Sequence, residues 1–113
     1  MRKILKPWGY EQILEKNKKY VVKRLFMKKN HRCSLQYHKV KIETVYVLSG
    51  ILKFQIGSKI NNLKTKILRP GDCVSINKKK IHRMHALKNT YYLEASTPDL
   101  DDVIRIKDDF NRI

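Results

Sequence analysis

The chain has 113 residues, a length usual for one domain and sufficient to bury a modest core without disulfides or a structural metal. Its hydrophobic content of 42% excludes a disordered chain, and no apolar run approaches the ~18 residues of a membrane span. Because residues 1–6 also lack the apolar stretch of a secretion signal, we expect a cytoplasmic protein that does not contact a membrane. In that compartment Cys33 and Cys73 are expected to be buried free thiols.

Positive charge dominates the composition. The chain carries 26 Lys and Arg against 10 Asp and Glu, a formal net charge of +16, which favours anionic partners. Most of the positive residues stand alone between apolar or polar neighbours, as on a solvated surface. A surface for nucleic acid would interleave basic and aromatic residues for base stacking, and that pattern is weak here. We therefore do not expect nucleic acid as the partner.

Along the chain the hydrophobic period is two, which indicates strands. Leu52, Phe54 and Ile56 alternate with polar residues, whereas residues 44–48 form a nearly continuous apolar run, as in a strand covered on both faces. The run from Arg69 to Asp72 contains Pro-Gly, a strong turn signal. Strands are predicted, in chain order, at 20–27, 44–48, 52–56, 63–68, 73–76, 81–87 and 91–95. Apart from a helical turn that could begin at 98–102, this is an all-β chain, and we expect one sandwich or barrel domain over residues 1–113.

The residues with metal chemistry lie close together in the middle of the chain. Gln36 and His38 are two apart, so on a strand they project from one face, and Glu43 follows after a turn at 39–42. His82 would share its face with Met84 and Ala86 on a later strand. An amide oxygen, a carboxylate and two imidazoles form a mixed nitrogen and oxygen site that suits Zn, Mn, Fe or Ni.

The order of these residues resembles the two motifs of the cupin superfamily. More narrowly, nearly the whole chain resembles the C-terminal cupin domain of type II mannose-6-phosphate isomerase/mannose-1-phosphate guanylyltransferase. The resemblance lies in the following residues: Lys6-Pro7-Trp8-Gly9-Tyr10-Glu11, Val22-Lys23-Arg24-Leu25, Ser34-Leu35-Gln36-x-His38, Glu43, Val47-Leu48-Ser49-Gly50, Gly71-Asp72, Ile81-His82-Arg83, Leu93-Glu94, Asp101-Asp102-Val103-Ile104-Arg105 and Asp108-Asp109-Phe110-Asn111-Arg112.

The resemblance implies a jelly-roll β-barrel that binds one divalent metal. The implied metal ligands are Gln36, His38, Glu43 and His82, with zinc as the first candidate and manganese, iron, cobalt or nickel as alternatives. The implied activity is isomerisation of a phosphorylated sugar between its aldose and ketose forms, as in mannose-6-phosphate isomerase, for the synthesis of polysaccharide precursors. A homodimer is also expected from this resemblance.

Isomerisation requires a group that moves a proton and cations that hold the phosphate. For catalysis we single out Glu94 and Arg24. Arg24 is preferred to Lys23 because it shares its phase with Val22 and Phe26, while Glu94 could face the interior as a proton carrier or solvent as an ion-pair partner. Lys80 and Arg83 are the candidates for substrate binding, although Arg83 could instead form a surface ion pair.

The chain departs from the family pattern at several positions. Val40 replaces a further histidine, Asn77 and Lys79 replace a Pro and a Gly before the second motif, and Lys29-Asn30 replaces a Pro-Gly turn. These changes concern the loops at the mouth of the barrel and hence the identity of the substrate. The nucleotidyltransferase domain that precedes this cupin in such proteins is not among these residues, so we do not expect guanylyltransfer. The alternative function is a non-catalytic cupin that binds a sugar or nucleotide sugar.

Overall fold

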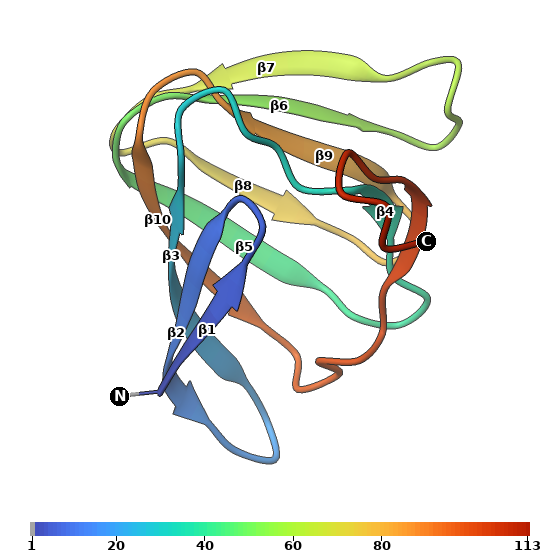
Figure 1. Ribbon diagram of the computed structural model, residues 1–113. Coiled ribbons are helices and arrows are strands. Elements are labelled where there is room, and N and C mark those ends of the chain that lie inside the picture. Colours follow the sequence, from blue (N-terminus) through green and yellow to red (C-terminus); the bar gives the residue numbers. More distant parts are fainter. Residues whose placement is uncertain (1) are drawn as a thin grey trace.

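The computed structural model describes residues 2–113, which fold into two antiparallel β-sheets (Figure 1). One sheet has the strand order β1-β2-β3-β10-β5-β8 and the other the order β11-β4-β9-β6-β7. The all-β prediction is confirmed, and residues 2–113 contain no helix that is long and apolar enough to cross a membrane. The strands are β1 (Arg2–Lys6), β2 (Gly9–Lys16), β3 (Val21–Met27), β4 (Leu35–Tyr37), β5 (Glu43–Ser49), β6 (Leu52–Gly57), β7 (Lys64–Leu68), β8 (Cys73–Ile76), β9 (Ile81–Ala86), β10 (Thr90–Ser96) and β11 (Ile104–Lys107).

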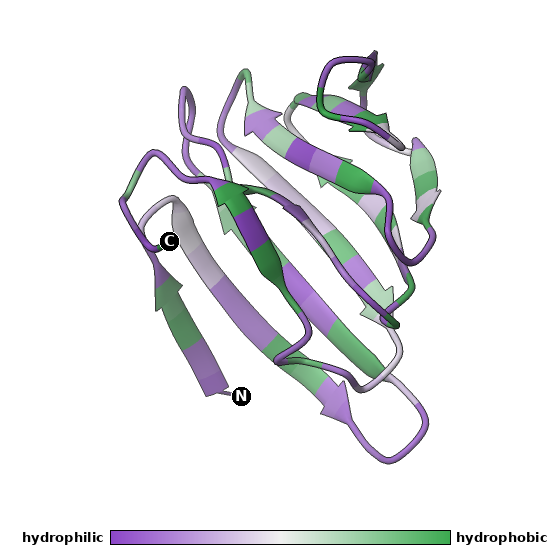
Figure 2. Ribbon diagram, turned by 90° about the vertical axis from the view of Figure 1, so that its right-hand side faces the viewer, coloured by the Kyte–Doolittle hydropathy of each residue, from purple (hydrophilic) through white to green (hydrophobic). Residues whose placement is uncertain are grey.

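Successive side chains of a strand point to opposite faces of its sheet, and this alternation decides which residues enter the core. Figure 2 shows hydrophobic and hydrophilic residues alternating along several strands. On β5, Glu43, Val45 and Val47 are buried, while Tyr46 and Leu48 are exposed. The expectation that residues 44–48 are covered on both faces is therefore wrong, because the second apolar face of β5 lies on the outside of its sheet.

The chain changes sheets between β4 and β5, and this crossing positions the predicted ligands. Gln36 lies on β4 in direct register with His82 on β9. His38 follows the end of β4, and Glu43 begins β5 in the opposite sheet. The turn predicted at Arg69 to Asp72 is also present, and Gly71 there adopts φ of 92°. Residues 98–102 form a turn without a helix, so the helical turn considered there is wrong.

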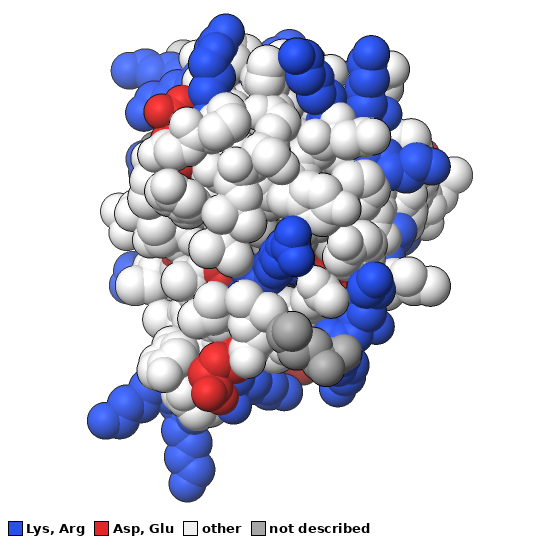
Figure 3. Space-filling view, turned by 90° about the vertical axis from the view of Figure 1, so that its left-hand side faces the viewer, with Lys and Arg blue, Asp and Glu red and all other residues white. Residues whose placement is uncertain are grey.

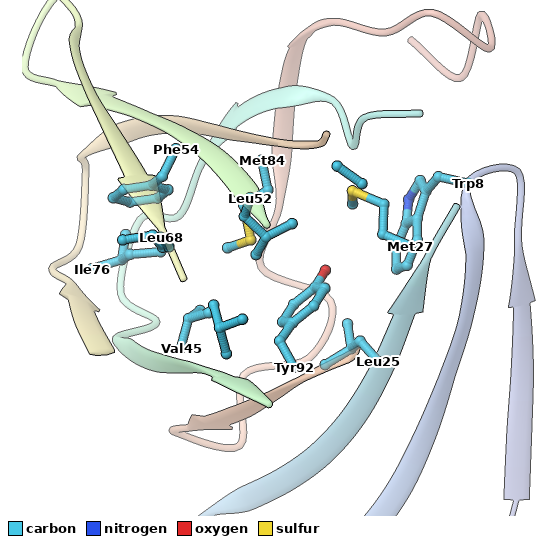
Figure 4. Packing of buried hydrophobic residues seen from close by; sticks show 12 residues of the cluster. Trp8, Leu25, Met27, Val45, Leu52, Phe54, Leu68, Ile76, Met84 and Tyr92 are labelled. Atoms are coloured by element: carbon cyan, nitrogen blue, oxygen red, sulfur yellow. The ribbon is translucent and has the colours of Figure 1, made fainter. Parts of the chain in front are cut away.

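The apolar core fills the space between the two sheets (Figure 4). Phe54, Leu68 and Ile76 pack together at one end of the cluster, whereas Trp8 lies beside Met27 at the other end. Both cysteines are free, as expected. Cys33 packs against this core, but Cys73 is exposed, so the expectation of burial is wrong for Cys73.

Phe54→Ala is expected to lower the free energy of unfolding by about 3–5 kcal/mol, because it removes a large ring that is 1% exposed and leaves a cavity. Leu5→Ala is the control, since Leu5 is 81% exposed and its truncation should change stability by less than ~0.5 kcal/mol. Equilibrium unfolding in urea measures both variants. Equal, small effects would show that the ring does not hold the two sheets together.

The positive charge is spread over the surface. Figure 3 shows one side of the molecule, where Lys and Arg stand mainly around a broad uncharged area. Large apolar side chains that are exposed on the six-stranded sheet include Tyr46 and Leu48 of β5.

Candidate metal centre

Three predicted ligands meet between the two sheets: His38, Glu43 and His82. Their exposed side-chain fractions are only 2%, 3% and 1%, and one ligand atom from each lies within 4.8 Å of the other two. Oε1 of Glu43 is 3.2 Å from Nε2 of His38 and 3.3 Å from Nε2 of His82. The three residues lie directly after β4, at the first position of β5 and at the second position of β9, so the crossing between sheets brings them together.

Backbone carbonyl groups orient both imidazole rings. Nδ1 of His38 donates a hydrogen bond to the carbonyl oxygen of Asp102, and Nδ1 of His82 donates one to that of Lys80 at 2.9 Å. A ring whose Nδ1 carries the proton leaves the lone pair of Nε2 free to bind a metal. Both Nε2 atoms face the Glu43 carboxylate, so the two tautomers required for metal binding are the ones that the backbone favours.

Asp102 also holds the loop that carries His38 toward Glu43. Its carboxylate accepts hydrogen bonds from the backbone N–H groups of Lys39, Val40 and Lys41 at 3.0, 2.8 and 2.9 Å. The N–H of Val40, followed by those of Lys39 and Lys41, lowers the pKa of Asp102 to about 2. One side chain thus organises the loop, while the backbone of the same residue orients His38.

We expect Asp102→Ala to be less stable than the wild type at neutral pH, and this difference to shrink as the pH falls from about 4 toward 2. The folded-state pKa of Asp102 lies below its ordinary value of 3.8, so its contribution is present above pH 4 and is lost as the carboxylate is protonated. Thermal unfolding of both proteins between pH 2 and 7 measures this effect. A stability difference that is independent of pH would contradict the role of the carboxylate.

A buried lysine joins two carboxylates beside the triad. Nζ of Lys41 lies 3.3 Å from Oε2 of Glu43 and 3.5 Å from Oε1 of Glu94. Burial, followed by the negative charge of Glu43, raises the pKa of Glu94 to about 8. Burial also acts to raise the pKa of Glu43, but its contacts with the rings of His38 and His82 and the charge of Lys41 outweigh it, so this pKa is well below its usual value. The two carboxyl groups therefore differ in their affinity for a proton.

The triad opens into a cavity of about 90 Å³ between the sheets. Its apolar wall contains Trp8, Leu25, Met84 and Tyr92, which belong to the core cluster. The polar and charged lining is formed by Gln36, His38, Glu43, His82, Glu94, Lys6, Lys41, Arg105 and Arg112. Glu94 therefore faces the interior, which resolves the two orientations left open by the sequence.

The donor set fits a divalent metal. Two imidazole nitrogens and a carboxylate oxygen can converge on one ion, and the backbone contacts of both rings are those found behind metal-bound histidines. Gln36 lines the same cavity, and its Oε1 accepts a hydrogen bond from Ser34 at 2.6 Å. Binding of the metal by Gln36 as a fourth ligand stays a prediction.

Arg24 is not part of this cavity, and its expected inward orientation is wrong. On β3 the inward phase is that of Val21, Lys23 and Leu25, whereas Arg24 is exposed and its guanidinium lies 4.8 Å from the centre of the Tyr91 ring. Burial of Lys23 becomes tolerable because its Nζ pairs with Glu11 at 3.2 Å. The sequence misled us because apolar residues occupy both faces of β3.

The two residues predicted to bind substrate also lie outside the cavity lining. Arg83 is buried, and its Nε donates to the carbonyl oxygen of Cys33 at 2.9 Å. Nζ of Lys80 donates to Oγ of Ser58 at 2.9 Å, and only the carbonyl oxygen of Lys80 serves the site, through His82. Arg83 also lies 3.7 Å from a carboxylate oxygen of Asp109, which is the ion pair considered as its alternative role, and substrate binding by either residue stays a prediction.

The sequence reasoning missed several residues that surround the triad. Lys41 could have been found, because it lies two positions before Glu43 and so shares the inward phase of that strand. Asp102 and Arg105 come from the C-terminal part of the chain, and nothing in the local pattern connects them with His38. Lys6 and Arg112 reach the cavity from the two ends of the chain.

Comparisons with known proteins agree with this architecture. KdgF from Halomonas sp. has a similar structure, with a TM-score of 0.75 and 15% identity over 86% of each chain. Oxalate decarboxylase from Bacillus subtilis matches with a TM-score of 0.79 and 16% identity, over 93% of this chain and 30% of that chain. These likenesses confirm the predicted cupin fold.

A curated relative extends the comparison to sequence. The chain is 28% identical over 115 residues to mannose-1-phosphate guanylyltransferase 2 of Escherichia coli O157:H7, covering 95% of this chain and 22% of that protein. It spans less than a quarter of the length of the curated relatives that it matches, at 22% and 23%. The model of the family described as mannose-6-phosphate isomerase C-terminal matches residues 1–108, and the chain therefore belongs to this family.

Proposed function

We propose that this chain is a metal-dependent isomerase of a phosphorylated sugar, of the mannose-6-phosphate isomerase type, that serves the synthesis of polysaccharide precursors. The observation that carries the proposal is the buried triad of His38, Glu43 and His82, which shares one cavity with a second carboxyl group, Glu94. Membership of the mannose-6-phosphate isomerase C-terminal family supports the choice of reaction.

In this proposal Gln36, His38, Glu43 and His82 hold the metal, with zinc as the first candidate. A bound metal would supply a Lewis acid that stabilises negative charge on the sugar oxygens. An Oε atom of Glu94 removes the proton from C2 of the aldose and returns it to C1, while the hydroxyl proton leaves O2 and a proton is taken up by O1, which yields the ketose. Lys41 keeps Glu94 beside Glu43 through its contacts of 3.5 and 3.3 Å. Trp8 and Tyr92 close the apolar side of the cavity against water.

The closing experiment is an isomerase assay on the purified chain with mannose 6-phosphate, in the presence of Zn²⁺, Mn²⁺, Fe²⁺, Co²⁺ or Ni²⁺. We expect formation of fructose 6-phosphate with at least one metal, and loss of this activity in Glu43→Gln. Other hexose and heptose phosphates extend the assay to related substrates. Sugar binding without turnover under all these conditions would instead support a non-catalytic sugar-binding cupin.

A further inference from the structure

Of the four cationic side chains that line the cavity, two are neutralised by carboxylates. Lys41 contacts Glu43 and Glu94, and Arg112 forms two hydrogen bonds to Asp108, at 2.7 and 3.0 Å. The other two are Lys6, at the end of β1, and Arg105, on β11. Within residues 2–113 neither of them forms an ion pair.

Arg105 shows a further sign of a missing partner. Its Nε is buried and has no hydrogen-bond partner in the part of the chain that the structure describes. A buried N–H without a partner costs free energy, and a charged donor costs more. A bound anion would remove this cost.

The sheet register directs Arg105 toward the metal ligands. Arg105 pairs with Gln36 across β11 and β4, and Gln36 pairs with His82 across β4 and β9. Directly opposed residues project from the same face of a sheet, and all three line the cavity. The pairing of β11 shifts after Arg105, and such irregularities often redirect a side chain beside a functional site.

We infer that Arg105, with Lys6, forms the subsite that binds the phosphate group of the substrate. Arg105 stands two strands away from His82, a separation of roughly 10 Å between their backbones. A small phosphorylated sugar can therefore direct its carbonyl end to the triad and its phosphate to Arg105. Guanidinium groups match phosphate oxygens with two parallel hydrogen bonds, and Lys6 adds a second positive charge. The identity of the sugar rests on the proposed function, whereas the anion subsite does not.

The test measures binding of inorganic phosphate, mannose 6-phosphate and mannose to metal-free protein through the fluorescence of Trp8. Trp8 is the single tryptophan of the chain and lines the cavity. We expect Arg105→Gln to weaken binding of both phosphates by about 10-fold or more, because a hydrogen bond to a charged group is lost, and to leave mannose binding unchanged. Arg105→Lys, which keeps the charge without Nε, should recover part of the loss.

Arg24→Gln is the matched control, because it removes the same charge from an exposed position outside the cavity. Thermal unfolding verifies that the variants are folded. Equal phosphate binding by Arg105→Gln and Arg24→Gln would overturn the inference, since the anion would then be attracted only by the overall positive charge. Isomerase activity with an unchanged KM in Arg105→Gln would also overturn it, while leaving the proposed function intact. Phosphate binding that depends on Arg105 in a wild-type protein without isomerase activity would uphold the subsite and reject the proposed function.

Discussion

His38→Ala and His82→Ala are each expected to lower the affinity for Zn²⁺ or Co²⁺ by more than about 100-fold. Even the partners that orient metal ligands commonly contribute 10–100-fold to affinity, so loss of a ligand should cost more. Both imidazoles present Nε2 to the Glu43 carboxylate, and neither has a neighbouring His, Cys, Asp or Glu among residues 2–113 that joins the cluster in its place. Calorimetric titration measures the affinity for Zn²⁺, and the absorption of bound Co²⁺ reports the donor set.

The chain supplies its own controls for this experiment. His31 and His85 are the other two of its four histidines, and neither belongs to the triad. His31→Ala and His85→Ala should therefore bind metal as the wild type does. Because His38 and His82 are buried, alanine could unfold the chain, so His38→Gln and His82→Gln provide variants that retain a polar side chain. Stoichiometric metal in folded variants lacking both imidazoles would reject the triad as the metal centre.

Most of the sheet structure could be predicted from the sequence, because the central strands are short, alternate regularly and end at turn residues. The predicted stretch 52–56 coincides with β6 (Leu52–Gly57), and 73–76 coincides with β8 (Cys73–Ile76). β1, β2 and β11 were missed. These strands lie at or next to the sheet edges, and their own patterns are weak, so their neighbours determine their pairing.

The missed strands explain why the predicted inward face of β3 was wrong. The alternation of side chains along β3 cannot by itself decide whether Lys23 or Arg24 faces the interior, because apolar residues flank both. The deciding interaction is the ion pair of Lys23 with Glu11, which lies on β2 and becomes visible only when that strand is known. Tyr10 then packs against Phe26 on the outer face, with 5.5 Å between ring centres, and covers the side on which Arg24 lies. Which face of β3 points inward thus depends on Glu11, a partner that the local sequence of β3 does not reveal.

The metal ligands were easier to predict than the residues around them. A strand, a turn and a second strand place His38 and Glu43 together over a short sequence distance, and His82 follows from the order of the motifs. Asp102 and Arg105 act from the C-terminal end of the chain, at contacts set by tertiary packing. The triad can therefore be predicted from the sequence, whereas the residues that surround it, such as Asp102 and Arg105, require the fold.

Glu94→Gln is expected to lower kcat of the proposed isomerisation by ~10²–10⁴-fold, the usual contribution of a group that transfers a proton. Gln preserves the shape of the side chain and can still accept a hydrogen bond from Lys41, which also retains its contact with Glu43 at 3.3 Å. Metal content and KM should therefore change little, and the loss should appear in kcat. Steady-state kinetics on mannose 6-phosphate, with metal analysis of the same preparations, measures these quantities.

Glu11→Gln is the matched control, because Glu11 also pairs with a buried lysine, Lys23, but does not line the cavity. If both variants lose activity to the same extent, the effect comes from a disturbed ion pair rather than from proton transfer. If Glu94→Gln retains full kcat, another group must move the proton. Loss of metal from Glu94→Gln would place its carboxylate among the groups that hold the ion. Only a kcat decrease confined to Glu94→Gln, with metal retained, fits a carboxyl group that works beside the metal and not on it.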